Sequence, residues 1–341
     1  VYKRQALYNG NKRLKTIQQE KLNNQVAELD VATSENNIQE SIAQVYIQIL
    51  YAAESVKVNE STLQVSIAQR DRGQELLNAG SIAKSDFAQL EAQVSTDRYQ
   101  LVTAQATLED YKLQLKQLLE LDGENEMNIY LPALSDENVL APLPTKKDVY
   151  ISALSLRPEI EASKLNVEAS ELGIGIAKSS YLPTISLSAG IGTNHTSGSD
   201  FTFGEQVKNG WNNSIGLSVS VPIFNNRQTK SAVQKAKLQY ETSMLSLLDE
   251  QKTLYKTIEG LWLDANSAQQ RYAAANEKLK STQISYNLIS EQFNLGMKNT
   301  VELLTEKNNL LQAQQEQLQA KYMAILNTQL LKFYQGDQLA I

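Results

Sequence analysis

Residues 181–224 read YLPTISLSAGIGTNHTSGSDFTFGEQVKNGWNNSIGLSVSVPIF, and the fold depends on this stretch. Apolar residues alternate with Thr, Ser or Gly over residues 184–191 and again over 215–221. This alternation predicts two strands with one apolar and one polar face. Each arm has about the 9–11 residues that a tilted strand needs to cross a bilayer, which predicts a transmembrane β-hairpin. An ordinary hairpin on a soluble core would alternate in the same way. The apolar, membrane-facing residues are Ile185, Leu187, Ala189, Ile191, Ile215, Leu217, Val219 and Val221.

The composition of the chain excludes several classes of protein. Its 341 residues carry a net charge of −6, one histidine and no cysteine, which rules out disulfides, thiolate metal sites and cysteine nucleophiles. No Gly-rich phosphate loop, nucleophile–base set or pair of metal ligands is recognisable. We therefore expect that the protein is not an enzyme and that it has no catalytic residue, cofactor or metal. The mild acidity argues against nucleic acid as a partner. No apolar run approaches the roughly 18 residues of a transmembrane helix.

The first five residues have an unusual sequence. Val1–Gln5 read VYKRQ, which is the translation of GTGTATAAGAGACAG, a transposon end used in sequencing libraries. We therefore expect residues 1–5 to be non-native, with natural sequence beginning near Ala6 and the true N-terminal part missing.

Two long helical hairpins are predicted on either side of the chain's middle. All prolines lie between Pro132 and Pro222, and the flanks are rich in strong helix formers. Residues 10–78 predict one helix, Asn78-Ala79-Gly80 a turn, and residues 85–121 a return helix that ends at Asp122-Gly123. Short helices are predicted over 147–156 and 158–180. Residues 193–213 predict a long exposed loop.

The helical hairpin is duplicated. Residues 6–10 match residues 222–226, and at the same spacing Asn78 matches Asn294 and Gly80 matches Gly296. A gapless register over about 80 residues is typical of an internal repeat. The second unit predicts a helix over 228–294, a glycine turn and a return helix to about Tyr334. Since a strand hairpin precedes the second unit, another is expected upstream of Ala6.

These patterns divide the chain into segments. They are residues 1–5 (non-native), 6–121 (first helical hairpin), 122–180 (irregular linker with short helices), 181–224 (transmembrane β-hairpin), 225–336 (second helical hairpin) and 337–341 (tail). Two strand hairpins give four strands, which cannot close a barrel alone. Several chains around one barrel, with cyclic symmetry, are therefore expected.

Three stretches resemble the TolC-type outer-membrane efflux channel family. They are Arg157-Pro158-Glu159 with residues 176–178 and 181–187, Val221-Pro222-Ile223-Phe224-Asn225-Asn226, and Asn294-Leu295-Gly296 with Val301-Glu302-Leu303-Leu304. The resemblance implies a mainly α fold with a transmembrane β-hairpin. In a homotrimer, duplicated αα-hairpins would form an α-barrel tunnel in the periplasm, continuous with a twelve-stranded outer-membrane β-barrel. A periplasmic adaptor, an inner-membrane pump and outer-membrane lipid would be its partners.

The same resemblance assigns roles to residues at the helix tips. Glu302 falls on the family's acidic pore constriction, and Thr305 on a second position that is often acidic. Lys298, Phe293, Ser85 and Asp86 fall on a latch that holds the closed state, although Phe293 lacks the hydroxyl of the usual tyrosine. Asn78, Gly80, Asn294 and Gly296 mark the tips where an adaptor would bind. Without the resemblance, a solvated carboxylate at a helix start is the favoured interpretation of Glu302, and the resemblance favours the constriction.

The function predicted from these features is the exit duct of a tripartite efflux system. The alternatives are the outer-membrane duct of a type I protein secretion system, and a soluble structural coiled-coil protein with residues 181–224 as a β insertion. The soluble alternative leaves the apolar face of the hairpin without a partner.

Overall fold

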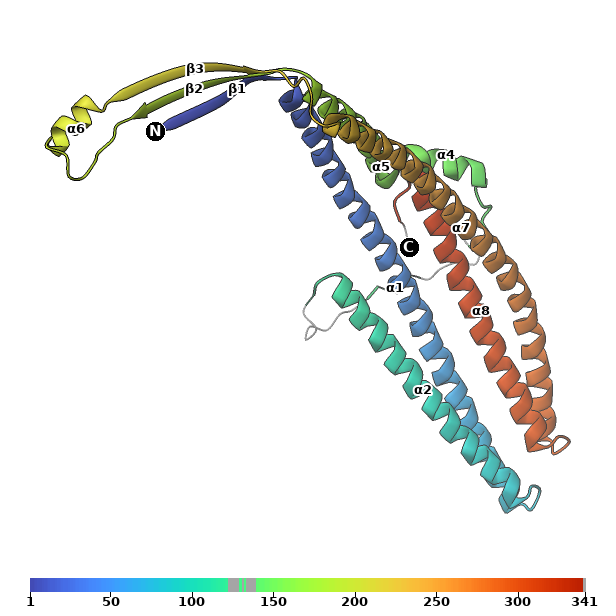
Figure 1. Ribbon diagram of the computed structural model, residues 1–341. Coiled ribbons are helices and arrows are strands. Elements are labelled where there is room, and N and C mark those ends of the chain that lie inside the picture. The colour runs from blue at the N-terminus through green and yellow to red at the C-terminus, as the bar shows by residue number, and fades with distance from the viewer. Residues whose placement is uncertain (122–128, 131, 133–138, 340–341) are drawn as a thin grey trace. The chain divides into compact units, whose positions relative to one another are not determined.

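The computed structural model describes residues 1–121, 129–130, 132 and 139–339, and helices dominate it (Figure 1). The chain divides into two compact units. The sheet unit comprises Val1–Thr33 and Arg157–Thr253, and the hairpin unit comprises Ser34–Leu156 and Leu254–Ile341. These units do not follow the predicted segments, because both long helices run from one unit into the other.

The sheet unit holds an antiparallel sheet in the order β1-β2-β3. Its strands are β1 (Tyr2–Asn9), β2 (Thr184–Gly192) and β3 (Asn212–Ser220). The arms predicted from alternation are thus β2 and β3. The structure also extends strand β1 through residues 2–5, the stretch expected to be non-native, and pairs it with β2. An irregularity in the register falls between Ala6 and Tyr8.

The predicted loop between the two arms contains a short helix, so that prediction was wrong in part. Helix α6 spans Phe203–Asn209. The Thr202 side chain accepts a hydrogen bond from the Glu205 backbone N–H at 3.4 Å, and Glu205 Oε2 accepts from the Thr202 N–H at 2.9 Å. This reciprocal capping box starts a helix even within a Gly- and Ser-rich stretch.

Helices α1 (Lys12–Asn78) and α7 (Gln228–Asn294) leave the sheet through matching turns. Two consecutive residues with positive φ precede each helix, namely Gly10 and Asn11 before α1, and Asn226 and Arg227 before α7. Gly10 is also tightly packed, because a Cβ there would lie 2.7 Å from the Ser179 carbonyl oxygen. Ser179 begins the 3₁₀ turn Ser179–Tyr181, which links helix α5 (Pro158–Lys178) to β2.

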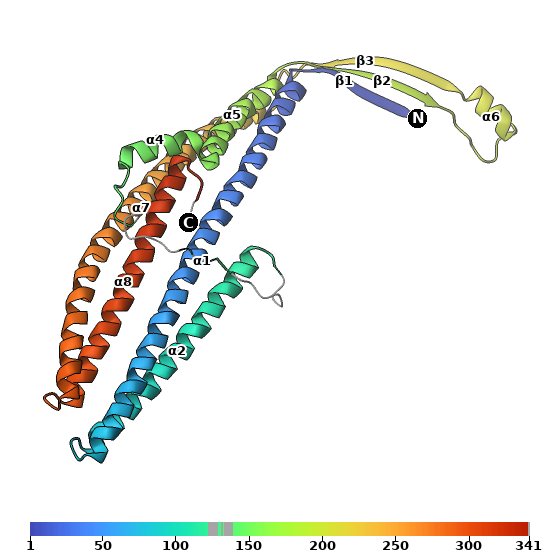
Figure 2. The ribbon, with the colours of Figure 1, turned by 180° about the vertical axis from the view of Figure 1, so that it is seen from behind.

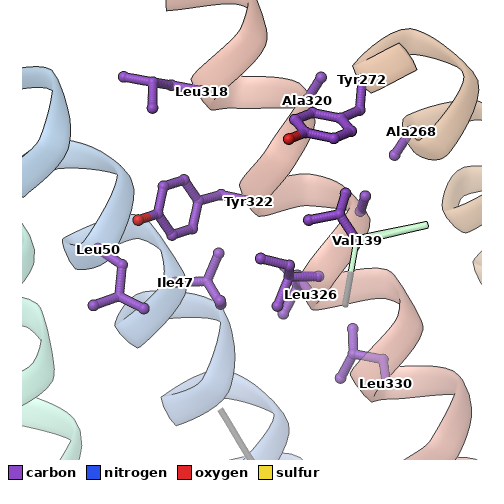
Figure 3. Packing of buried hydrophobic residues seen from close by; sticks show 12 residues of the cluster. Ile47, Leu50, Val139, Ala268, Tyr272, Leu318, Ala320, Tyr322, Leu326 and Leu330 are labelled. Carbon is purple, nitrogen blue, oxygen red and sulfur yellow. The ribbon is translucent and has the colours of Figure 1, made fainter. Parts of the chain in front are cut away.

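The hairpin unit contains α1 from Ser34 onward and α7 from Leu254 onward, with their return helices (Figure 2). These are α2 (Lys84–Leu118) and α8 (Thr300–Gln335); α4 (Lys146–Leu156) packs on α8. Its main core joins α1, α7 and α8 (Figure 3). Ile47 and Leu50 come from α1, Tyr272 from α7, and Tyr322 and Leu326 from α8. Long helices with weak amphipathicity are held by such tertiary packing rather than by propensity alone.

The predicted duplication is confirmed by the helix bounds. Lys12 and Gln228 differ by 216 positions, as do Asn78 and Asn294, so α1 and α7 have 67 residues each. The return helices begin at Lys84 and Thr300, which again differ by 216. The end of the first return helix predicted at Asp122-Gly123 lies outside the described residues, and α2 ends at Leu118.

Candidate functional site

The two helix tips have the same local structure. Gly80 has φ +74° and Gly296 has φ +73°, a conformation that favours glycine. After each helix a backbone N–H reaches back five residues, from Ser81 to the Leu76 carbonyl at 2.8 Å and from Met297 to the Gln292 carbonyl at 2.9 Å. These are Schellman C-caps, and they turn each chain back toward its return helix.

The start of helix α8 is fully capped, whereas the start of α2 is half-capped. Asn299 Oδ1 accepts from the Glu302 N–H at 2.9 Å, and Glu302 Oε2 accepts from the Asn299 N–H at 3.2 Å. At the start of α2 the N-cap residue is Ala83, so only the Asp86 carboxylate contributes, accepting from the Ala83 N–H at 3.3 Å. Sequence reasoning therefore placed both acidic residues correctly at first turns.

Glu302, the predicted constriction residue, is already paired within its own chain. Its Oε1 accepts a hydrogen bond from Lys298 Nζ at 2.6 Å, one turn earlier. The Lys298 ammonium, followed by the Asn299 backbone N–H, lowers the pKa of the Glu302 carboxyl below its usual value. Thr305, the second predicted constriction residue, is exposed, and its hydroxyl donates to the Val301 carbonyl at 2.8 Å.

The residues predicted to form a latch have other partners within the chain. Lys298 contacts Glu302, and among the described residues no ion pair joins it to Asp86. Phe293 is 2% exposed and packs with Leu90 and Leu303, so it serves as a core residue that holds the two tips together. Ser85 is exposed at the first tip. In a single chain these side chains therefore do not form the expected set of contacts.

A buried polar cluster above the tips was missed by sequence reasoning. Asp97 on α2 is 1% exposed and Lys307 on α8 is 3% exposed, and they form an ion pair. Ser66 on α1 donates to Asp97 Oδ2 at 2.5 Å, and Gln93 donates to Oδ1 at 2.9 Å. The available signal was position. Both charged residues fall in the apolar stripes of their helices, after Leu90 and Val94 and between Leu303 and Leu310.

The sheet register brings the predicted membrane-facing residues together. Directly opposite pairs are Ile185 with Val219, Leu187 with Leu217, and Ala189 with Ile215. The intervening pair Ser186 with Ser218 points to the other face. Every residue of β3 is exposed, and Ile215 is 85% exposed. The other two predicted residues lie at the ends of this apolar face. Ile191 is paired with the polar Asn213, and Val221 lies one residue beyond the end of β3.

Polar residues interrupt the same face on β1. Lys3 lies opposite Ala189 and Gln5 opposite Leu187, while Tyr8 lies opposite Ile185. Both polar residues fall within residues 1–5. None of the helices in the described ranges has an apolar stretch that could cross a membrane. Within the same ranges, no group of three or more His, Asp or Glu side chains is arranged to hold a metal ion.

Comparisons with known proteins agree on one family. The family model described as outer membrane efflux protein matches residues 149–336. The outer membrane efflux protein BepC of Brucella suis is 24% identical over 294 residues, which cover 86% of this chain and 61% of BepC. The outer membrane protein TolC of Escherichia coli is 23% identical, over 89% of this chain and 62% of TolC. The chain thus spans about three fifths of the length of these curated relatives.

A solved structure shows the same fold. A crystal structure of CusC, described as reviewing conformational changes that accompany folding and transmembrane channel formation, superposes with a TM-score of 0.85 at 18% sequence identity. The match covers 99% of this chain and 77% of CusC. The mainly helical fold with duplicated hairpins and a sheet is therefore shared despite the low identity.

Proposed function

Because this chain belongs to the outer membrane efflux protein family, we propose that it forms the outer-membrane exit duct of a tripartite efflux system. Small molecules would pass from an inner-membrane pump and a periplasmic adaptor to the exterior. The observation that carries this proposal is the exposed apolar face of β2 and β3, joined through short turns to two long helical hairpins. The face suits lipid, and the hairpins suit a periplasmic tunnel.

The assembly that follows is a homotrimer. The described sheet has β1 and β3 at its edges, and a sheet in lipid cannot leave edge groups unpaired. Three chains with four strands each, the number that the duplication predicts, would close a twelve-stranded barrel. The six helical hairpins of the trimer would line the tunnel.

The constriction would be a ring of ion pairs rather than of bare carboxylates. In a trimer, three symmetric Glu302 side chains would concentrate negative potential in a narrow pore and favour cations. Each carries Lys298 as its counter-ion at 2.6 Å, and this reduces that potential. Lys298 is 34% exposed and Glu302 is 40% exposed, so the pair is accessible to solvent and screened by salt.

The latch and the adaptor sites are proposed for the assembled trimer. Lys298, whose ammonium has three donors, would contact Asp86 in addition to Glu302, and the exposed Ser85 would add a hydroxyl. The mutation Lys298→Glu should then raise single-channel conductance, and an unchanged conductance would remove the latch. The exposed residues Asn78, Gly80, Asn294 and Gly296 would receive the adaptor, because glycine turns allow close approach of another backbone.

Membrane fractionation and planar bilayers test the proposed function. We expect the protein to fractionate with the outer membrane, to change its gel mobility on heating and to give discrete conductance steps. A monomer that stays soluble without detergent and gives no steps would instead support the structural coiled-coil protein. Export of a protein substrate, without efflux of small molecules, would support the type I secretion duct.

A further inference from the structure

The buried ion pair between Asp97 and Lys307 joins the two helical hairpins of one chain. Asp97 lies on α2 of the first hairpin and Lys307 on α8 of the second, and their side chains are 1% and 3% exposed. The Asp97 carboxylate also accepts from Ser66 on α1 and from Gln93 on α2. Three helices therefore converge on one carboxylate.

The packing around this pair does not by itself fix how the hairpins align. Toward the tips lie Leu90, Phe293 and Leu303, and apolar contacts of this kind are not directional. Two neutral hydrogen bonds also join the hairpins near the pair, from Gln93 on α2 to Asn308 Oδ1 on α8 at 3.5 Å and from Gln69 on α1 to the Tyr286 hydroxyl on α7 at 2.9 Å, but their partners stay neutral when they separate. A buried ion pair differs, because sliding α8 past α2 would separate the Lys307 ammonium from the Asp97 carboxylate and leave both charges buried without a counter-ion. The best-attested use of such buried polar groups is to fix register.

We propose that Asp97 and Lys307 clamp α2 to α8, so that the two helical hairpins of a chain hold one register. Ser66 and Gln93 orient the carboxylate for this contact. The clamp acts by excluding alternative alignments, and apolar residues of similar size would pack there without excluding them.

The internal duplication indicates what lies at the other edge of each hairpin pair. Adding 216 to 97 gives Ala313 on α8, and subtracting 216 from 307 gives Glu91 on α2. Ala313 is buried and Glu91 is exposed. In the proposed trimer, on which this step rests, the repeat relates the clamp to a contact between α8 of one chain and α2 of its neighbour. That contact has Ala313 and Glu91 in place of the ion pair.

Spin-label distances between the hairpins test the clamp. The chain has no cysteine, so Ala88→Cys on α2 and Asn287→Cys on α7, both exposed positions, give a single labelled pair. Labelled chains are diluted with unlabelled ones so that only distances within a chain are read. We expect one narrow distance distribution for the parent, and a broadened or split distribution for Asp97→Leu/Lys307→Met, with helix content retained.

The exposed pair Lys278–Glu316, 2.7 Å apart between α7 and α8, gives the matched control. Lys278→Met/Glu316→Gln should keep the narrow distribution. If Asp97→Leu/Lys307→Met fails to fold, Asp97→Asn/Lys307→Gln is measured instead, and a broadened distribution is again expected. A broad parent distribution, or a narrow one in either clamp variant, overturns the clamp. Loss of folding in both variants also overturns it, because the pair would then serve stability and not register. Trimer assembly and conductance, measured on the parent, test the proposed channel separately.

Discussion

The first helical hairpin, α1–α2, and the second, α7–α8, have matching helix bounds and turns. Their side chains differ at the positive-φ turns and at the helix caps. Both begin with two residues of positive φ, but Gly10 stands in the first where Asn226 stands in the second. Both return helices carry an acidic residue in the first turn, but only Asn299 completes a cap. Duplication has thus kept the backbone while each copy has acquired its own polar contacts.

The deepest difference between the copies is buried. Asp97 of the first hairpin is paired with Lys307, whereas the equivalent position of the second hairpin is Ala313, which is fully buried and apolar. A position in the seam between helices can therefore be filled by a methyl group or by a charge, provided that the charge has a partner. The following substitutions separate these possibilities, beginning with the largest effect.

Removal of the Asp97 carboxylate should destabilise the protein most. Asp97→Ala leaves the Lys307 ammonium buried and unpaired, which costs about 3–5 kcal/mol in the free energy of unfolding. Ala313→Asp should also destabilise strongly, since the new carboxylate is buried without a base. Urea unfolding followed by circular dichroism measures both. Asp110→Ala, at an exposed site on α2, should change little, and an equally small loss for Asp97→Ala would refute a role for the buried pair.

Substitutions at the strand-to-helix turns should have the next largest effect on stability, and the effect should differ between the two copies. An alanine at Asn226 keeps a positive φ and should cost about 1–2 kcal/mol. Gly10→Ala should cost more, because its Cβ would also lie 2.7 Å from the Ser179 carbonyl oxygen. Thermal unfolding of the two variants gives the comparison, with Asn226→Gly as a control that should be tolerated. Equal losses at both positions would mean that the contact with Ser179 has no energetic weight.

The helix caps should respond in opposite directions. Asn299→Ala removes a side-chain acceptor from the α8 cap and should cost about 1 kcal/mol. Ala83→Asn supplies the missing acceptor to α2 and should stabilise by a similar amount, about 1 kcal/mol. The two substitutions together exchange the capping state of the two copies. Chemical unfolding measures the free energy of unfolding of each variant, and the double variant tests whether the two changes are additive. A destabilising Ala83→Asn would show that the first tip cannot adopt the full capping box.

The architecture was predictable because periodicity and turn residues are local signals. The spacing of Gly80 and Gly296, with the surrounding helix formers, predicted the end of both long helices at the correct residue. Alternation predicted β2 and β3. The contacts of Lys298, Phe293 and Asp97 were not predictable in this way, because they depend on how separate helices align. A charged residue within an apolar stripe indicates burial with a partner, but it does not say which residue that partner is.

The smallest effect concerns the Lys298–Glu302 pair, which only the second hairpin possesses; the equivalent residues of the first are Ile82 and Asp86. The pKa of Glu302 is lowered, first by Lys298 and then by the Asn299 N–H. The ionised carboxylate therefore stabilises the folded tip fully at pH values above 4.5, the usual pKa of this group. This stabilisation is lost as the pH falls through the lowered pKa. Lys298→Met should raise the pKa toward 4.5 and move that loss to higher pH.

A carboxylate titration by ¹³C NMR measures this shift, with Glu302→Gln to identify the signal. Reversal potentials across a bilayer provide the functional readout, since Lys298→Met also removes the counter-ion from the proposed constriction and should increase cation selectivity. Ile82→Lys is the reciprocal variant, because it places a base one turn before Asp86 in the first hairpin. If the constriction lies at Glu302 alone, Ile82→Lys leaves the reversal potential unchanged. A shift of similar size but opposite direction in Ile82→Lys would mean that both tips face the pore, and that the two hairpins are functionally equivalent.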